Sequence, residues 1–128
     1  MTDGKDPSRP IALVVEDDQD QRALAAALIE ETELAVVECA SAEAALGVAD
    51  TAGEAVVMVL TDLHLAGAMD GIELAQRLRS QCPNASVVVT SGNPGRRLAE
   101  LPDGAMFMHK PWRALDLLRI AERVQAAA

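Results

Sequence analysis

Short apolar runs alternate with helix-like stretches along this chain. The first run, Ile11–Val15 (IALVV), is continuous and is followed at once by acidic residues, as in a parallel strand that is buried on both faces. Comparable runs predict four further strands at residues 34–37, 55–60, 86–91 and 105–109.

Helical periodicity follows each predicted strand. The pattern predicts helices at residues 19–32, 42–52, 71–82, 96–101 and 113–128. In the first of these, Leu24, Ala27 and Leu28 fall on one face, and Ser41 is the expected N-cap of the second. Asp70 and Glu73 have the spacing of a capping box at the start of the third, which Pro83 ends.

Apolar stripes on two helices indicate which faces are buried. The third helix has Leu74, Ala75, Leu78 and Cys82 on one face, and the last has Leu117, Ile120, Ala121 and Val124. Leu115 and Leu118 fall off the stripe of the last helix, where they suggest a surface for a partner or a second copy.

Strict alternation of strands and helices defines the fold class. It predicts an α/β fold, a doubly wound five-stranded parallel sheet with helices on both faces, joined by right-handed crossovers. A polar lead at residues 1–9 precedes one domain at residues 10–128. Ligands of such sheets bind at the carboxyl ends of the strands.

The amino-acid composition excludes several classes of partner and location. The formal net charge of −9 repels nucleic-acid phosphates and anionic lipid, so we expect no nucleic-acid or membrane partner. No apolar run is long enough to cross a bilayer or to act as a signal peptide, which predicts a cytoplasmic protein.

Cys39 and Cys82 lack a metal or redox motif, so both are expected to be reduced. Alanine is abundant and the aromatic residues are only Phe107 and Trp112, so the core must close with small side chains.

Chemically active side chains follow the predicted strands. Glu16 and Asp17 come after the first strand, Asp62 after the third, Ser91 at the end of the fourth and Lys110 after the fifth. Acids that gather at one edge repel each other unless a cation joins them, and oxygen ligands without His or Cys favour Mg2+. A carboxylate beside Mg2+ and a lysine is a nucleophile that can accept a phosphoryl group.

These residues lie in short motifs whose order resembles the receiver domains of bacterial two-component response regulators. The resemblance covers residues 11–124. It is carried by Glu16 and Asp17 in VVEDD, Asp62 in VLTDLHL, Asp70-Gly71, Ser91 in VVVTSG, and Lys110-Pro111, with Phe107 three residues before the lysine.

The resemblance implies a role for each residue. Asp62 would accept the phosphoryl group, Lys110 would pair with it, and Ser91 would move toward it while Phe107 turns inward as a switch. Mg2+, the one cofactor implied, would be held by Asp17, Asp62, the backbone carbonyl of His64 and, through water, Glu16. The alternative for Phe107 is that it only packs in the core and has no part in a switch.

The resemblance also implies partners. A sensor histidine kinase or a histidine phosphotransfer protein would supply the phosphoryl group, and an unidentified protein would bind the face formed by the fourth helix, fifth strand and fifth helix. With no output domain in the sequence, we expect a stand-alone receiver, monomeric or weakly dimeric, that acts as a switch rather than an enzyme.

Two segments depart from the family pattern. The stretch from Asp62 to Asp70 is one residue longer than the commonest spacing, and Ala66 stands where proline is frequent. The stretch between Ser91 and Lys110 is short and rich in proline and glycine. We therefore expect an altered loop around an intact site, and a small or mobile fourth helix.

Other functions are weighed against this one. A Mg2+-dependent aspartyl-phosphate phosphatase typically has a second acid two residues after its nucleophile, whereas this chain has His64 there. A flavodoxin-like cofactor binder needs a glycine-rich first turn, which here is acidic. A non-phosphorylated pseudo-receiver would not need Asp17, Asp62, Ser91 and Lys110 together. His64 itself is expected to be an exposed loop residue, with an effect on water attack at the acceptor as the alternative.

Overall fold

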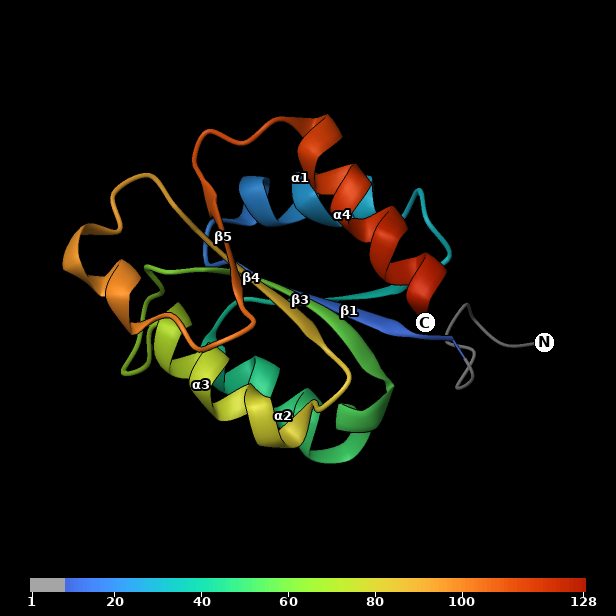
Figure 1. The fold of residues 1–128 in the computed structure, drawn as a ribbon, viewed down its shortest axis with the longest axis horizontal. Helices are drawn as coiled ribbons and strands as arrows, with labels where there is room; N and C mark the ends of the chain where they lie inside the picture. The colour runs from blue at the N-terminus through green and yellow to red at the C-terminus, as the bar shows by residue number, and fades with distance from the viewer. Residues whose placement is uncertain (1–8) are drawn as a thin grey trace.

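Five parallel strands form the centre of the molecule, in the order β2-β1-β3-β4-β5 (Figure 1). The computed structural model describes residues 9–128, so most of the predicted polar lead lies outside the described residues. The strands are β1 (Ile11–Val15), β2 (Ala35–Cys39), β3 (Val56–Asp62), β4 (Ser86–Ser91) and β5 (Met106–His109). The predicted strands are confirmed, and the main correction is that β3 continues to Asp62.

Helices cover both faces of this sheet. They are α1 (Gln19–Ile29), α2 (Ala42–Ala52), α3 (Gly71–Gln81) and α4 (Ala114–Ala127), with short 3-10 helices η1 (Gly53–Ala55) and η2 (Gly95–Glu100). Figure 1 shows α1 and α4 on one side of the sheet and α2 and α3 on the other. The predicted doubly wound α/β fold is confirmed.

Alternate residues of β1 supply the two halves of the core. Ala12 and Val14 pack with Ala25, Ile29, Leu117 and Ala121 on the side of α1 and α4. Leu13 and Val15 pack with residues of α2 and α3 on the other side, as the two-residue period of a strand requires. Small alanines at the helix contacts bring the helices close to the sheet, which fits the alanine-rich composition.

The predicted apolar face of α1 is wrong in part: Leu28 packs against the core as predicted, but Leu24 and Ala27 do not. Leu24 is 57% exposed and Ala27 is exposed, whereas Ala25, Ala26 and Ile29 are buried. The helix also ends at Ile29, because the Thr32 hydroxyl donates a hydrogen bond to the Ile29 carbonyl and accepts one from the Leu34 amide. These local hydrogen bonds turn the chain toward β2 instead of extending the helix.

The other helices agree with their sequence signals. Ser41 caps α2, and Asp70 and Glu73 form the expected capping box of α3. The stripe of α3 is buried to Cys82, and Leu117 and Ala121 of α4 are fully buried. Leu115 is 52% exposed, as predicted, and Leu118 is partly exposed.

The predicted fourth helix is a 3-10 helix. Pro94 precedes η2 and Gly95 begins it with a φ of 56°, a left-handed conformation that glycine adopts without strain. No residue of η2 is buried, so little apolar packing stabilises an α-helix there. The segment is therefore small, as predicted.

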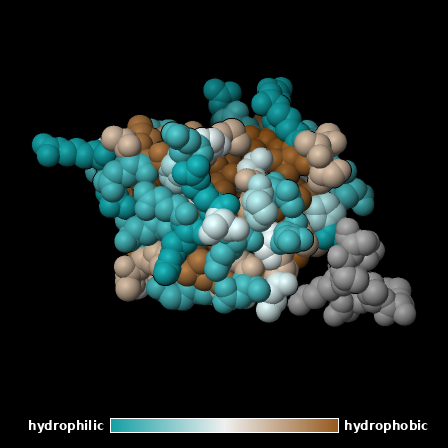
Figure 2. Space-filling view, turned by 60° about the horizontal axis from the view of Figure 1, so that its bottom comes forward, coloured by the Kyte–Doolittle hydropathy of each residue, from teal (hydrophilic) through white to brown (hydrophobic). Residues whose placement is uncertain are grey.

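The surface and the cysteines fit an ordinary globular domain. Figure 2 shows hydrophilic residues over much of one face, with hydrophobic residues between them. Cys39 and Cys82 are buried and unpaired, and burial raises the pKa of the Cys39 thiol to about 11, which keeps it protonated and unreactive at neutral pH. Within residues 9–128 there is no helix of the length and apolarity needed to cross a bilayer.

Candidate functional site

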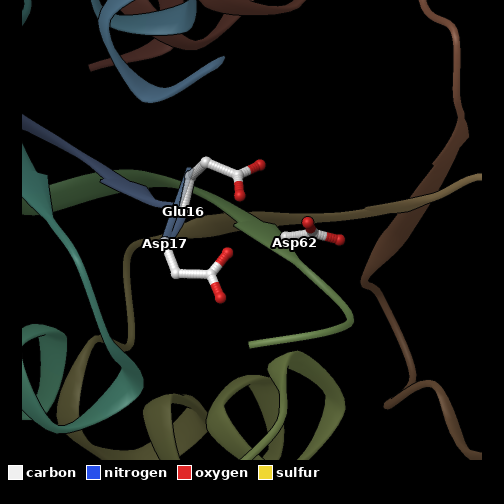
Figure 3. A group of neighbouring side chains, drawn as sticks. All are labelled: Glu16, Asp17 and Asp62. Atoms are coloured by element: carbon white, nitrogen blue, oxygen red, sulfur yellow. The ribbon is translucent and has the colours of Figure 1, made fainter. Parts of the chain in front are cut away.

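Three carboxylates meet where β1 and β3 end (Figure 3). Glu16 and Asp17 directly follow β1, and Asp62 is the last residue of β3. One carboxylate oxygen from each lies within 4.8 Å of the others. Glu16 and Asp62 are only 7% and 9% exposed, whereas Asp17 is exposed to solvent. The structure thus brings together the three acids that the sequence predicted.

Lys110 reaches this cluster from the end of β5. Its Nζ lies 3.0 Å from Asp62 Oδ2 and 3.3 Å from Glu16 Oε1. The Lys110 backbone N–H donates to the Ser91 carbonyl at 3.0 Å, which fixes the lysine to the end of β4. Because the cluster has three carboxylates and one ammonium, its net charge is negative and a further cation would balance it.

Burial and charge shift two of these groups. Burial raises the pKa of the Glu16 carboxyl, and the nearby Asp62 charge adds to this, while the Asp18 amide and Lys110 oppose it. Burial alone would lower the pKa of the Lys110 ammonium, but Asp62 and Glu16 together raise it above its ordinary value. Lys110 therefore stays charged at neutral pH, and it lies next to Glu16, whose burial disfavours the ionised carboxylate.

Backbone amides hold the carboxylates in place. Glu16 Oε2 accepts from the Asp18 amide at 3.1 Å, Asp17 Oδ2 from the Ala66 amide at 3.0 Å, and Asp62 Oδ1 from the His64 amide at 3.3 Å. The loop after β3 therefore bonds both to its own aspartate and to the acid of β1. Ala66 stands where proline is frequent in the family pattern, and its backbone N–H, which a proline lacks, makes the contact with Asp17.

Gly71 allows this loop to close. A Cβ at this position would lie 2.1 Å from the backbone oxygen of Asp62. The Gly71 amide also donates to the Leu63 carbonyl at 2.8 Å. The Asp70-Gly71 pair thus begins α3 and leaves space for the backbone of Asp62.

Ser91 ends β4 beside Lys110, whereas Phe107 lies on β5 three residues before the lysine. Ser91 is fully buried, and its Oγ accepts from the Asn93 amide at 3.0 Å. Phe107 is half-buried on β5 and packs edge-on against His109, with ring centroids 6.1 Å apart. Phe107 belongs to none of the apolar core clusters, and its role as a switch stays a prediction.

The His64 side chain faces the loop after β4. It is exposed, and its Nε2 lies 3.3 Å from the carbonyl oxygen of Asn93. This distance fits a hydrogen bond in the tautomer that has its proton on Nε2. The imidazole thus links the β3–α3 loop to the β4–η2 loop.

Three residues that the sequence analysis did not single out adjoin the site. Gln21, Thr90 and Trp112 line a cavity of about 20 Å³ together with Glu16, Asp62 and Lys110. Thr90 Oγ1 is buried there without a hydrogen-bond partner, and the volume suffices for one water molecule. Gln21 and Trp112 have no motif, but Thr90 could have been found because it precedes Ser91 in a buried strand.

The donor set fits a hard divalent cation. All three side chains offer carboxylate oxygens, the cluster has excess negative charge, and exposed Asp17 leaves a route to solvent. Mg2+ prefers such a site, since it keeps several waters and takes one or two carboxylates with phosphate oxygens.

Comparison with known proteins agrees with this geometry. The sequence profile described as response regulator receiver domain matches residues 12–122. No curated protein matches the chain.

Solved structures share the fold. A CheY-like response regulator receiver domain protein from Methanospirillum hungatei has a TM-score of 0.77 at 22% identity, covering 93% of this chain and 96% of that one. A response regulator receiver protein from Sinorhizobium medicae reaches 0.83 at 20% identity, covering 95% and 98%. NtrX from Brucella abortus, solved with ATP, is 30% identical with a TM-score of 0.74, over 91% of this chain and 27% of that one.

Proposed function

Because the chain belongs to the family of response regulator receiver domains, we propose that it accepts a phosphoryl group on Asp62. The donor is a phosphohistidine of a sensor histidine kinase or of a histidine phosphotransfer protein. The observation that supports this most is the Lys110 ammonium 3.0 Å from Asp62 Oδ2, beside a cluster of three carboxylates. A lone buried acid would have neither the cation nor the cluster.

Mg2+ is the cofactor of the proposed reaction. Asp17, Asp62 and the backbone carbonyl of His64 would hold it, with Glu16 contributing through water. When bound, the ion neutralises charge on the transferring phosphoryl oxygens. The carboxylates of this chain repel each other without it, so binding also relieves a cost that the fold imposes.

The transfer is a displacement at phosphorus. A carboxylate oxygen of Asp62 forms the new bond to phosphorus as the bond from phosphorus to the histidine nitrogen of the donor breaks. The imidazole of the donor leaves with that electron pair. Proton exchange with solvent then leaves it as a neutral ring. Lys110 exchanges its contact with Asp62 Oδ2 for a phosphoryl oxygen, and the Ser91 hydroxyl donates a hydrogen bond to another.

The signal is a change of surface rather than a product. Movement of Ser91 would pull on the loop through Asn93, whose amide bonds to Ser91 Oγ, and Phe107 would turn inward behind it. Both changes alter the face formed by η2, β5 and α4, where a downstream protein binds. In this proposal the domain works in the cytoplasm as a monomer or weak homodimer and is not a turnover enzyme.

Intact-mass spectrometry tests the proposal. The protein is incubated with acetyl phosphate and Mg2+, alongside Asp62→Asn and the matched control Asp103→Asn, which changes an exposed acid in the turn before β5. We expect one phosphoryl group on the wild type and on Asp103→Asn, and none on Asp62→Asn or after removal of Mg2+.

Each other outcome has a definite meaning. A folded wild type that binds Mg2+ but takes no phosphoryl group from acetyl phosphate or from any histidine donor would contradict the proposal and favour the pseudo-receiver. Steady release of phosphate from small phosphomonoesters would instead favour the aspartyl-phosphate phosphatase.

A further inference from the structure

Lys110 has a third partner besides the two carboxylates. Its Nζ donates to Gln21 Oε1 at 2.8 Å, the shortest of its three side-chain contacts. An ammonium has three N–H donors, so Glu16, Asp62 and Gln21 together satisfy all of them.

The first turn of α1 fixes Gln21 in this position. The Gln21 backbone amide donates to the Oδ1 of Asp18, the N-cap of α1, at 3.0 Å. The Asp18 amide in turn donates to Glu16 Oε2 at 3.1 Å. A short chain of hydrogen bonds thus joins the Glu16 carboxylate, the helix cap and the backbone of Gln21, whose side chain contacts the lysine.

The three partners of Lys110 differ in what else can bind them. Glu16 and Asp62 are members of the carboxylate cluster that a divalent cation would join, and Asp62 is the proposed acceptor. Gln21 is neutral, outside that cluster, and contacts Lys110 from a helix. Its carboxamide oxygen stays available to the lysine when the other two partners change.

We propose that Gln21 is a positioning residue that keeps Lys110 over Asp62 while the lysine exchanges its carboxylate partners for a phosphoryl oxygen. The inference rests on the proposed phosphoryl transfer and names a residue that acts through Lys110. Without Gln21, the flexible lysine side chain spends more time in solvent, and ordering it again costs side-chain entropy.

Chemical labelling tests the contact without metal or phosphodonor. Lysines of this chain are Lys5 and Lys110, so peptide mapping after brief acetylation reports Lys110 against Lys5 as an internal reference. The variant Gln21→Met keeps the length of the side chain and removes the acceptor. Gln19→Met makes the same change at an exposed residue of the same helical turn. We expect Lys110 to react at least twofold faster in Gln21→Met and unchanged in Gln19→Met.

Phosphorylation kinetics tests the role. At saturating Mg2+ and with acetyl phosphate, we expect Gln21→Met to be phosphorylated three- to tenfold more slowly than the wild type. The Mg2+ affinity, followed by Trp112 fluorescence or calorimetry, should stay within twofold because Gln21 is not a member of the carboxylate cluster. A general distortion of the site would weaken both.

The outcomes separate this inference from the proposed function. If the wild type takes no phosphoryl group, the proposed function fails first, whatever the labelling shows. If the wild type is phosphorylated, then unchanged labelling of Lys110, an unchanged rate in Gln21→Met, or an equal loss of Mg2+ affinity would each overturn the inference.

Discussion

Two neighbouring regions at the carboxyl edge of the sheet are built in opposite ways. The acidic site is held by buried strands, by backbone amides on each carboxylate and by a lysine with three partners. Residues 92–105 form a 3-10 helix and turns in which no residue is buried. The first region fixes charges in place, whereas the second is held to the fold by a few polar contacts and by Leu101, which packs partly buried against one core cluster.

The polar contacts of this second region, residues 92–105, show where it can move. We call it the yielding region. The Arg97 side chain forms an ion pair with Asp70 and another with Glu100, and Gln76 donates to the Glu100 carbonyl. These groups are partly or largely exposed, and exposed ion pairs stabilise little. A receiver needs both properties, since chemistry requires a fixed geometry and a signal requires a segment that can move at low cost.

Two glycines give the largest test of this difference. We expect Gly71→Ala to lower the free energy of unfolding by about 3 kcal/mol, since a Cβ would overlap the Asp62 backbone. At Gly95 no atom lies within 4 Å of an added Cβ. Gly95→Ala therefore costs only the strain of an alanine in a left-handed conformation with a φ of 56°, about 1 kcal/mol. Urea unfolding of both variants measures the ratio. Equal losses would contradict the contrast between a fixed and a yielding region.

Removing one charge from the cluster should stabilise the protein when Mg2+ is absent. We expect Asp17→Asn to raise the free energy of unfolding by about 1 kcal/mol, because one of three neighbouring carboxylates is gone. The amide oxygen can still accept from Ala66. Wild type should gain about 2.7 kcal/mol in Mg2+ at 100 times the dissociation constant, and the variant much less. A destabilised variant in metal-free buffer would show that the acids do not repel each other.

The buried glutamate should make stability depend on pH. Its pKa is raised above 4.5 in the folded protein, so the folded state binds this proton more tightly than the unfolded chain. Without Mg2+, wild type should therefore lose stability relative to Glu16→Gln as pH rises from about 4.5 through the folded pKa. Above that pKa the difference should level off. Urea titrations between pH 4.5 and 8 check this, and a pH-independent difference would refute it.

The smallest effect is expected in the yielding region. Arg97→Met removes the ion pairs to Asp70 and Glu100 and should change the free energy of unfolding by less than about 0.5 kcal/mol. Amide exchange within η2 should nonetheless become faster. Greater destabilisation, or an unchanged exchange rate, would mean that these contacts do not hold the segment as described.

Within the fixed region, the sequence predicts the residues at the strand ends better than the rotation of helix α1. Strand ends place acids and a lysine at one edge whatever the loops do, so Glu16, Asp17, Asp62 and Lys110 were predictable from order alone. The burial of Ala25 in place of Leu24 was not, because the rotation of α1 depends on its cap at Asp18 and on the turn at Thr32. Gln21 was missed because its contact depends on that same rotation.

Hydrogen–deuterium exchange with and without phosphorylation is the most direct test of the central claim, that a group added at a fixed site is read by the yielding segment. The protein is compared in Mg2+ before and after saturation with acetyl phosphate, with Asp62→Asn as the control. We expect altered exchange at residues 92–105 and in the loop after Asp62, with β1 and the core of β3 unchanged. Phosphorylation at Asp62 that leaves residues 92–105 unaltered would contradict the account.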